Sequence, residues 1–198
     1  MSRARDRFGV HDESACRQDL ADAIAVSCSA PHGPRAVRAG LYDFFALSDY
    51  RSAGVTHTWY TGNAFIRPAN LQNGRVIGRS GAEKGGDRTL AYFIAHELMH
   101  AMTMDRLGRW RLARLPRFQE EGYADYVAFA RSVDLARGRT DLVANTADMD
   151  PYRSGHYDRY RLLVAYLLQR RGLSADELLA RPLAQRKVEA ELLADQLP

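Results

Sequence analysis

The fold is decided by the stretch Ala95-His96-Glu97-Leu98-Met99-His100, which lies near the middle of residues 88–106. Apolar residues recur along 88–106 at helical spacing, so the pattern predicts a single helix. His96 and His100 are four residues apart and share one helical face, with roughly 5–6 Å between their Cβ atoms. Both imidazoles can therefore reach one metal ion, and Glu97 beside the first histidine can act as a general base on water there. This H-E-x-x-H spacing predicts a zinc site.

The length and composition favour one domain. With 198 residues and 46% hydrophobic content the chain can bury a sizeable core, and we expect a single domain over residues 1–198, allowing for poor order over residues 1–21. The net charge of +4 and the pI of about 9.2 come almost entirely from arginine, since Lys84 and Lys187 are the only lysines. No basic run interleaved with aromatic residues forms a binding stripe, so we expect no nucleic-acid partner.

Hydropathy and cysteine usage favour a cytoplasmic protein. The longest wholly apolar run, residues 162–168, is far too short to span a bilayer, and no apolar segment of a signal peptide follows the basic N-terminus. We therefore expect no membrane segment, although a signal or anchor upstream of this sequence would change the compartment. Cys16 and Cys28 lack the C-x-x-C spacing of a sulfur-ligated zinc site, and two free thiols are favoured over a disulfide. The oligomeric state stays open.

The first third of the chain is predicted to supply the β-structure. Residues 23–27 are expected to form a strand and residues 36–47 a helix with one buried face. Residues 55–61 and 64–67 are rich in β-branched and aromatic side chains and predict a hairpin, which Pro68 ends or turns into an edge. Within it, His57 is expected to be a structural histidine.

The remaining segments are predicted to be connections and supporting helices. Residues 73–87 contain five glycines in a polar setting and predict a mobile connection, with Asp87 as the N-cap of the central helix. Residues 141–155 are polar and loop-like, whereas residues 156–172 form a strong amphipathic pattern that ends in glycine. Residues 174–197 predict two short helices broken at a proline.

A second helix, predicted from residue 118 to about residue 136, can complete the metal site. A hydrolytic zinc site needs a third protein ligand and an open position for water. Glu121 follows His100 by 21 positions, which is enough chain for a loop and an antiparallel return. Asp125 lies four residues after Glu121 on the same face, so it can accept a hydrogen bond from a zinc-bound imidazole and fix the orientation of the ring.

The two motifs together resemble those of gluzincin metallopeptidases, the thermolysin-like and aminopeptidase-like clan. The shared elements are His96-Glu97-x-x-His100 and Glu121-Gly122-Tyr123-Ala124-Asp125-Tyr126. More closely, the pattern is similar to small bacterial peptidase-like domains with an Ile-Ala-His-Glu helix followed by an Arg-Glu-Gly-Tyr-Ala-Asp-Tyr helix. The resemblance implies that Glu121 is the third zinc ligand and that Asp125 is the partner of a ligand histidine. Glu120 stands where those relatives have a basic or neutral residue, so it stays an alternative ligand.

The same resemblance suggests a donor for the oxyanion that forms when water attacks a carbonyl. In aminopeptidase-like gluzincins a tyrosine begins a helix that ends in Tyr-Leu. Tyr157 takes that place when Tyr166-Leu167 is matched to the ending. Tyr160, Tyr152 and His156 stay open as alternatives.

We therefore expect an α+β fold, a zincin-like domain in which a small N-terminal β-sheet packs on a helical C-terminal half with the H-E-x-x-H helix at the centre. The expected function is zinc-dependent hydrolysis of a peptide or protein substrate. His96, His100 and Glu121 would hold Zn²⁺, Glu97 would move the proton of the attacking water, and Tyr157 would stabilise the oxyanion. The alternative is a non-catalytic or differently specialised metal-binding domain that retains the fold. Glu97 argues against it, because a purely structural metal site has no use for a general base.

Overall fold

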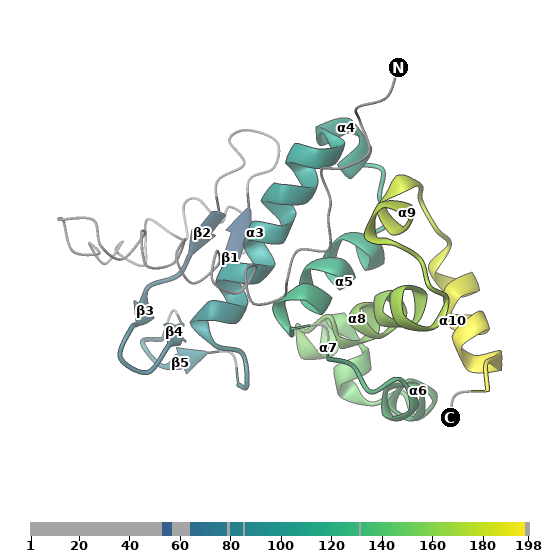
Figure 1. Ribbon diagram of the computed structural model, residues 1–198. Helices are drawn as coiled ribbons and strands as arrows, with labels where there is room; N and C mark the ends of the chain where they lie inside the picture. The colour runs from purple at the N-terminus through teal and green to yellow at the C-terminus, as the bar shows by residue number, and fades with distance from the viewer. Residues whose placement is uncertain (1–52, 57–63, 79, 85, 131, 197–198) are drawn as a thin grey trace, which may run out of the picture. The chain divides into compact units, whose positions relative to one another are not determined.

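The computed structural model describes residues 53–56, 64–78, 80–84, 86–130 and 132–196, which all fall within one unit of the chain, Arg38–Pro198 (Figure 1). The strand expected at residues 23–27, the helix expected at 36–47, the two cysteines and His57 lie outside the described residues. The prediction of one domain over the whole chain therefore stays a prediction. Within the described residues the architecture is α+β, mainly helical with small antiparallel sheets.

The strands of the described residues form two small antiparallel sheets, both ahead of the first described helix. Their bounds are β1 (Gly54–Thr56), β2 (Ala64–Ile66), β3 (Ala69–Asn70), β4 (Arg75–Ile77) and β5 (Glu83–Lys84). β1 pairs with β2, with Val55 opposite Phe65, which confirms the pairing expected for the hairpin. β4 lies between β3 and β5, so the predicted connection over residues 73–87 is wrong in part. The reason is the turn at Gly74 (φ 64°), which sends the β-branched residues of β4 back along β3.

Helix α3 (Leu90–Leu107) confirms the predicted central helix but begins later than expected. Its N-cap is Thr89 and not Asp87, because the Thr89 hydroxyl accepts a hydrogen bond from the backbone N–H of Tyr92 (3.2 Å). The helix ends at Gly108, in a left-handed conformation (φ 75°) that favours glycine. It packs against β1 and β2 on one side and against helix α5 (Arg117–Ala128) on another (Figure 1).

Helix α5 ends at Ala128, so the prediction of one helix to about residue 136 is wrong. Ala130 adopts a left-handed conformation (φ 54°) that no helix can continue through. A new helix, α6 (Leu135–Val143), starts behind the side chain of Asp134, which caps it. The polar stretch predicted as a loop contains the 3₁₀ turn η1 (Ala147–Met149) and the short helix α7 (Pro151–Ser154).

The C-terminal helices follow the prediction closely. Helix α8 (Asp158–Ala165) continues as the π-helical turn η2 (Tyr166–Arg170) and stops before Gly172, whose φ is 68°. Two short helices then flank Pro182, as expected. They are α9 (Ala175–Ala180), which begins with a capping box between Ser174 and Glu177, and α10 (Gln185–Ala194).

The core is built around α8, whose apolar face is buried against α5 and the C-terminal helices. Gly122 makes the crossing of α5 and α8 close, because a Cβ there would lie 2.5 Å from the carbonyl oxygen of Tyr160. The side-chain amide of Gln119, fully buried, donates to the carbonyl of Leu178 and accepts from the N–H of Leu183 (2.7 Å). These contacts fix α5, and with it the residues that follow Gln119. Of the described helices, none combines the length and apolarity that a membrane crossing requires.

Candidate metal centre

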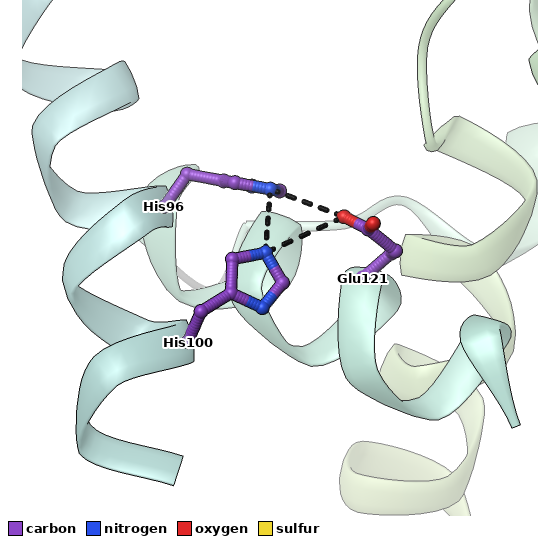
Figure 2. A group of neighbouring side chains, drawn as sticks. All are labelled: His96, His100 and Glu121. Atoms are coloured by element: carbon purple, nitrogen blue, oxygen red, sulfur yellow. Dashed lines mark hydrogen bonds and ion pairs between the residues drawn. The ribbon is translucent and has the colours of Figure 1, made fainter. Parts of the chain in front are cut away.

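Three predicted ligand side chains converge between α3 and α5 (Figure 2). The Nε2 atoms of His96 and His100 are 3.3 Å apart. The Oε2 atom of Glu121 lies 3.3 Å from the first and 3.5 Å from the second. A tetrahedral zinc ion with bonds of about 2.0–2.1 Å separates its ligand atoms by roughly 3.3–3.4 Å. The triangle of donor atoms therefore fits a small tetrahedral metal ion.

The charges of the centre also suit a cation. Burial alone would lower the pKa of His100, but its hydrogen bonds with Glu120 and Glu121 outweigh burial and raise that pKa to about 10. Burial favours the neutral form of Glu121, yet the hydrogen bonds from His100 and His96 hold the pKa of this carboxyl far below its usual range. These pKa shifts favour a protonated His100 beside a charged Glu121, an arrangement in which a metal ion can take the place of the proton.

Glu120 and Glu121 take different places at His100. Glu121 faces the Nε2 side of the ring, within the triangle, whereas the Oε1 atom of Glu120 lies 3.5 Å from Nδ1 on the other side. The structure therefore brings Glu121 to the two Nε2 atoms and leaves Glu120 as a neighbour of a ligand ring. Glu120 sits in the position from which a carboxylate fixes the orientation of an imidazole.

Asp125 lies behind His96 and is completely buried. Its Oδ1 atom is 3.8 Å from Nδ1 of His96, too long for the predicted hydrogen bond, and accepts a hydrogen bond from the hydroxyl of Tyr92 instead. Nη1 of Arg161 on α8 lies 3.6 Å from Oδ2. Burial raises the pKa of Asp125, and burial likewise raises the pKa of the Tyr92 phenol, which keeps its proton and acts as a donor.

Tyr92 is a site residue that sequence reasoning missed, although a signal for it exists. It precedes His96 by four residues, so both side chains lie on the same buried face of α3. Arg117 carries a comparable signal, because it precedes Glu121 by four residues and its Nε lies 3.8 Å from Oε1 of that glutamate. Arg161 and Thr56 come from distant segments, and no local pattern marks them.

Glu97 lies beside the triangle with its side chain facing β1. It is 7% exposed, and its Oε2 atom accepts a hydrogen bond from the hydroxyl of Thr56 (2.7 Å). Gly54 allows this approach, since a Cβ there would lie 2.7 Å from Oε1 of Glu97. Burial raises the pKa of Glu97, which is the direction a general base near neutral pH requires.

Tyr157 reaches the centre from the start of α8. Its ring stacks on the ring of His96, with centroids 5.8 Å apart and an interplanar angle of 9°, and its hydroxyl oxygen accepts a hydrogen bond from Nη2 of Arg117 (3.1 Å). Of the alternatives, Tyr160 stacks behind Tyr157 within the core. Tyr152 and His156 line the cleft, and Tyr152 is 86% exposed at its rim.

The centre opens into a cleft of about 680 Å³, a volume typical of ligand-binding sites. One wall is formed by residues 53–56, which include β1, and by Lys84 and Gly86. Arg117 and residues 151–157, which include α7, also line the cleft. Both predicted ligand histidines, Glu121 and Glu97 line the same cleft, so a molecule bound there would reach both the candidate metal position and the carboxylate of Glu97.

Comparison with known proteins finds no protein family whose model matches the chain, and no significant match among curated proteins or solved structures. A function for this chain therefore has to be inferred from the residues that line the cleft.

Proposed function

We propose that the protein is a zinc-dependent peptidase with a zincin-like fold, in which a small sheet packs on a helical half around α3. The observation that supports this most directly is the convergence of His96, His100 and Glu121 on one point, with edges of 3.3, 3.3 and 3.5 Å, next to an open cleft that Glu97 also lines. Two imidazoles and one carboxylate leave an open position on a tetrahedral ion, as hydrolytic zinc sites require.

When bound, a zinc ion would lower the pKa of water toward neutrality and polarise a carbonyl oxygen. Glu97 would accept the proton of the attacking water and later donate it to the leaving amine. The hydroxyl of Thr56 holds the carboxylate of Glu97 in place for both transfers (2.7 Å). Tyr157, packed on the ring of His96 and bonded to Arg117, would stabilise the negative charge that develops on the carbonyl oxygen.

The test is metal content measured together with hydrolysis of a peptide library, for the wild type and for Glu97→Gln. We expect about one zinc ion per chain in both proteins, because the substitution leaves the three ligands intact. We expect hydrolysis to fall by roughly 10²–10⁴ in Glu97→Gln, the contribution of a positioned general base. Glu191→Gln is the matched control, since it makes the same change at a carboxylate of α10 that does not line the cleft.

Two results would count against the proposal. Stoichiometric zinc without hydrolysis by either protein would favour a non-catalytic metal-binding domain. Loss of zinc in Glu120→Ala but not in Glu121→Ala would overturn the ligand assignment, since Glu121 is the carboxylate that faces both Nε2 atoms.

A further inference from the structure

The acidic and the basic side chains that line the cleft lie in different parts of it. All of its carboxylates belong to the centre, and each has a partner there. Glu97 accepts from Thr56, Glu120 faces Nδ1 of His100, and Glu121 faces both ligand imidazoles. Among the described lining residues, no carboxylate is left to bind the amino group of a substrate.

Basic side chains line the walls outside the centre. Arg88 is 5% exposed and lies 3.6 Å from a carboxylate oxygen of Asp158, so its charge is paired within the fold and does not face a bound substrate. Arg117 differs, because its side chain is 53% exposed although it bonds to Tyr157. Arg153 on α7 is exposed at the cleft, and no carboxylate of the described residues lies within ion-pair distance of it.

Arg117 on α5 and Arg153 on α7 both line the cleft, and we call the part of the lining that carries them the basic wall. Arg117 is joined to Tyr157 by a hydrogen bond of 3.1 Å and by the stacking of its guanidinium over the ring. Arg153 lies four residues before Tyr157, on the other side of the left-handed turn at Gly155 (φ 70°). A guanidinium binds a carboxylate through two parallel N–H donors, and it stays charged at every physiological pH.

We propose that this wall binds a carboxylate of the substrate, so that the cleft prefers acidic peptides over neutral or basic ones. The proposal rests on the proposed peptidase function and names its substrate class. The carboxylate is that of an Asp or Glu side chain near the scissile bond or that of the peptide's C-terminus. Arg153 supplies the unpaired charge, and Arg117 extends the basic wall toward the metal position.

The test uses the zinc-loaded full-length chain and alanine-based pentapeptides that carry Glu or Gln at the centre, each as a free acid and as a C-terminal amide. Binding is measured by calorimetry with the Glu97→Gln protein, and kcat/KM is measured with the wild type. We expect the Glu peptides to bind about fivefold more tightly than the Gln peptides, an advantage that shrinks as salt is added. If instead the free acids bind more tightly than the amides with either Glu or Gln at the centre, the wall binds the terminal carboxylate, which also supports the proposal.

Variants of Arg153 show whether a preference for acidic peptides comes from this wall or from the net positive charge of the whole chain. Arg153→Gln is expected to remove the preference, and Arg153→Glu to reverse it in favour of peptides with a central Lys. Arg114→Gln is the matched control, because it makes the same charge change at an exposed arginine that does not line the cleft. Equal effects of Arg114→Gln and Arg153→Gln would overturn the proposal.

The outcomes also distinguish this proposal from the proposed function. Equal kcat/KM for the Glu and Gln peptides, both as free acids and as amides, would overturn the substrate class and leave a zinc peptidase standing. Binding that depends on a carboxylate and on Arg153, in a protein that hydrolyses none of the peptides, would support the carboxylate site and count against the peptidase.

Discussion

At the scale of single residues, Tyr92 is the donor that holds the buried carboxylate of Asp125. We expect Tyr92→Phe to lower the free energy of unfolding by about 1–3 kcal/mol, because a buried charged acceptor loses its hydrogen bond. Zinc affinity should fall by up to about tenfold, since Asp125 lies against the ligand His96. Urea denaturation and competition with a zinc chelator measure the two effects. Tyr152→Phe, at an exposed tyrosine, should change neither, and an equal loss in both variants would contradict this role.

Thr56 is the second residue whose effect can be isolated, because its hydroxyl donates to the charged form of Glu97. Thr56→Val keeps the shape and removes the donor. Since the hydrogen bond lowers a pKa that burial raises, its loss should raise the pKa of Glu97 further. A general base acts only when it is deprotonated, so with a higher pKa the activity begins to fall at a higher pH as the solution is acidified. We expect the acid limb of the kcat/KM profile to move to higher pH in Thr56→Val and to return in Thr56→Ser, and an unmoved limb would contradict it.

The sequence predicted the site residues whose geometry is local. His96, His100 and Glu97 follow from helical spacing alone, and the structure brings them to one cleft. The prediction of Glu121 required the assumption that the chain returns beside α3, and α5 does pack against α3. For Asp125 the sequence did not predict the phenol of Tyr92, which reaches the carboxylate, while the imidazole of His96 lies 3.8 Å away. Such competition between neighbours is decided by tertiary packing and leaves no pattern in the sequence.

At the scale of elements, the crossing of α5 and α8 depends on Gly122. We expect Gly122→Ala to lower the free energy of unfolding by about 1–3 kcal/mol, because the added Cβ would meet the backbone of Tyr160 and the helices would have to separate. Zinc affinity should fall as well, since Glu121 precedes this glycine. The midpoint of urea unfolding and a zinc titration provide the measurements.

Gly138→Ala is the control for this prediction. A Cβ at Gly138 would meet the end of the Leu162 side chain rather than a backbone atom, and alanine favours the interior of α6 by up to about 1 kcal/mol. A smaller loss of stability and unchanged zinc affinity are expected there. If Gly138→Ala weakened zinc binding as much as Gly122→Ala, the close crossing would not be what positions Glu121.

The helix boundaries show where local rules stop. Both Asp87 and Thr89 are suitable caps by residue type, and the hydrogen bond to the N–H of Tyr92 decides for Thr89. Residues 118–136 continue an amphipathic pattern, but the left-handed Ala130 divides them. The sequence predicts a loop where helix α7 lies, because a four-residue helix carries too little periodicity to be recognised.

At the scale of the whole molecule, we expect folding stability and metal binding to depend on the same proton, that of His100. The folded metal-free protein raises the pKa of His100 to about 10, from 6.5 for an ordinary histidine. The stability that this proton provides is complete below about pH 6.5 and is lost as the pH rises through about 10. We therefore expect the metal-free protein to become less stable from about pH 7 to about pH 9, and the zinc-loaded protein to lack this trend. Urea midpoints with chelator and with zinc measure it.

Calorimetry checks the same prediction independently. Zinc binding at about pH 7 should release the proton of His100, because a ligand imidazole must be neutral. Binding enthalpies measured in two buffers with different heats of ionisation give the number of protons released. A value near zero would mean that His100 carries no proton in the metal-free state.

The position of Asp125 has a consequence for motion. Its carboxylate joins three helices, since it lies on α5, accepts from Tyr92 on α3 and faces Arg161 on α8. We therefore expect metal binding at His96 to stabilise the packing of α8 as well, and by reciprocity we expect stable packing of α8 to favour metal binding. We expect zinc to slow amide hydrogen exchange along α8 more than along α10, and Asp125→Asn to remove this difference. Metal binding at the centre would then stabilise a helix that supplies none of the three proposed ligands.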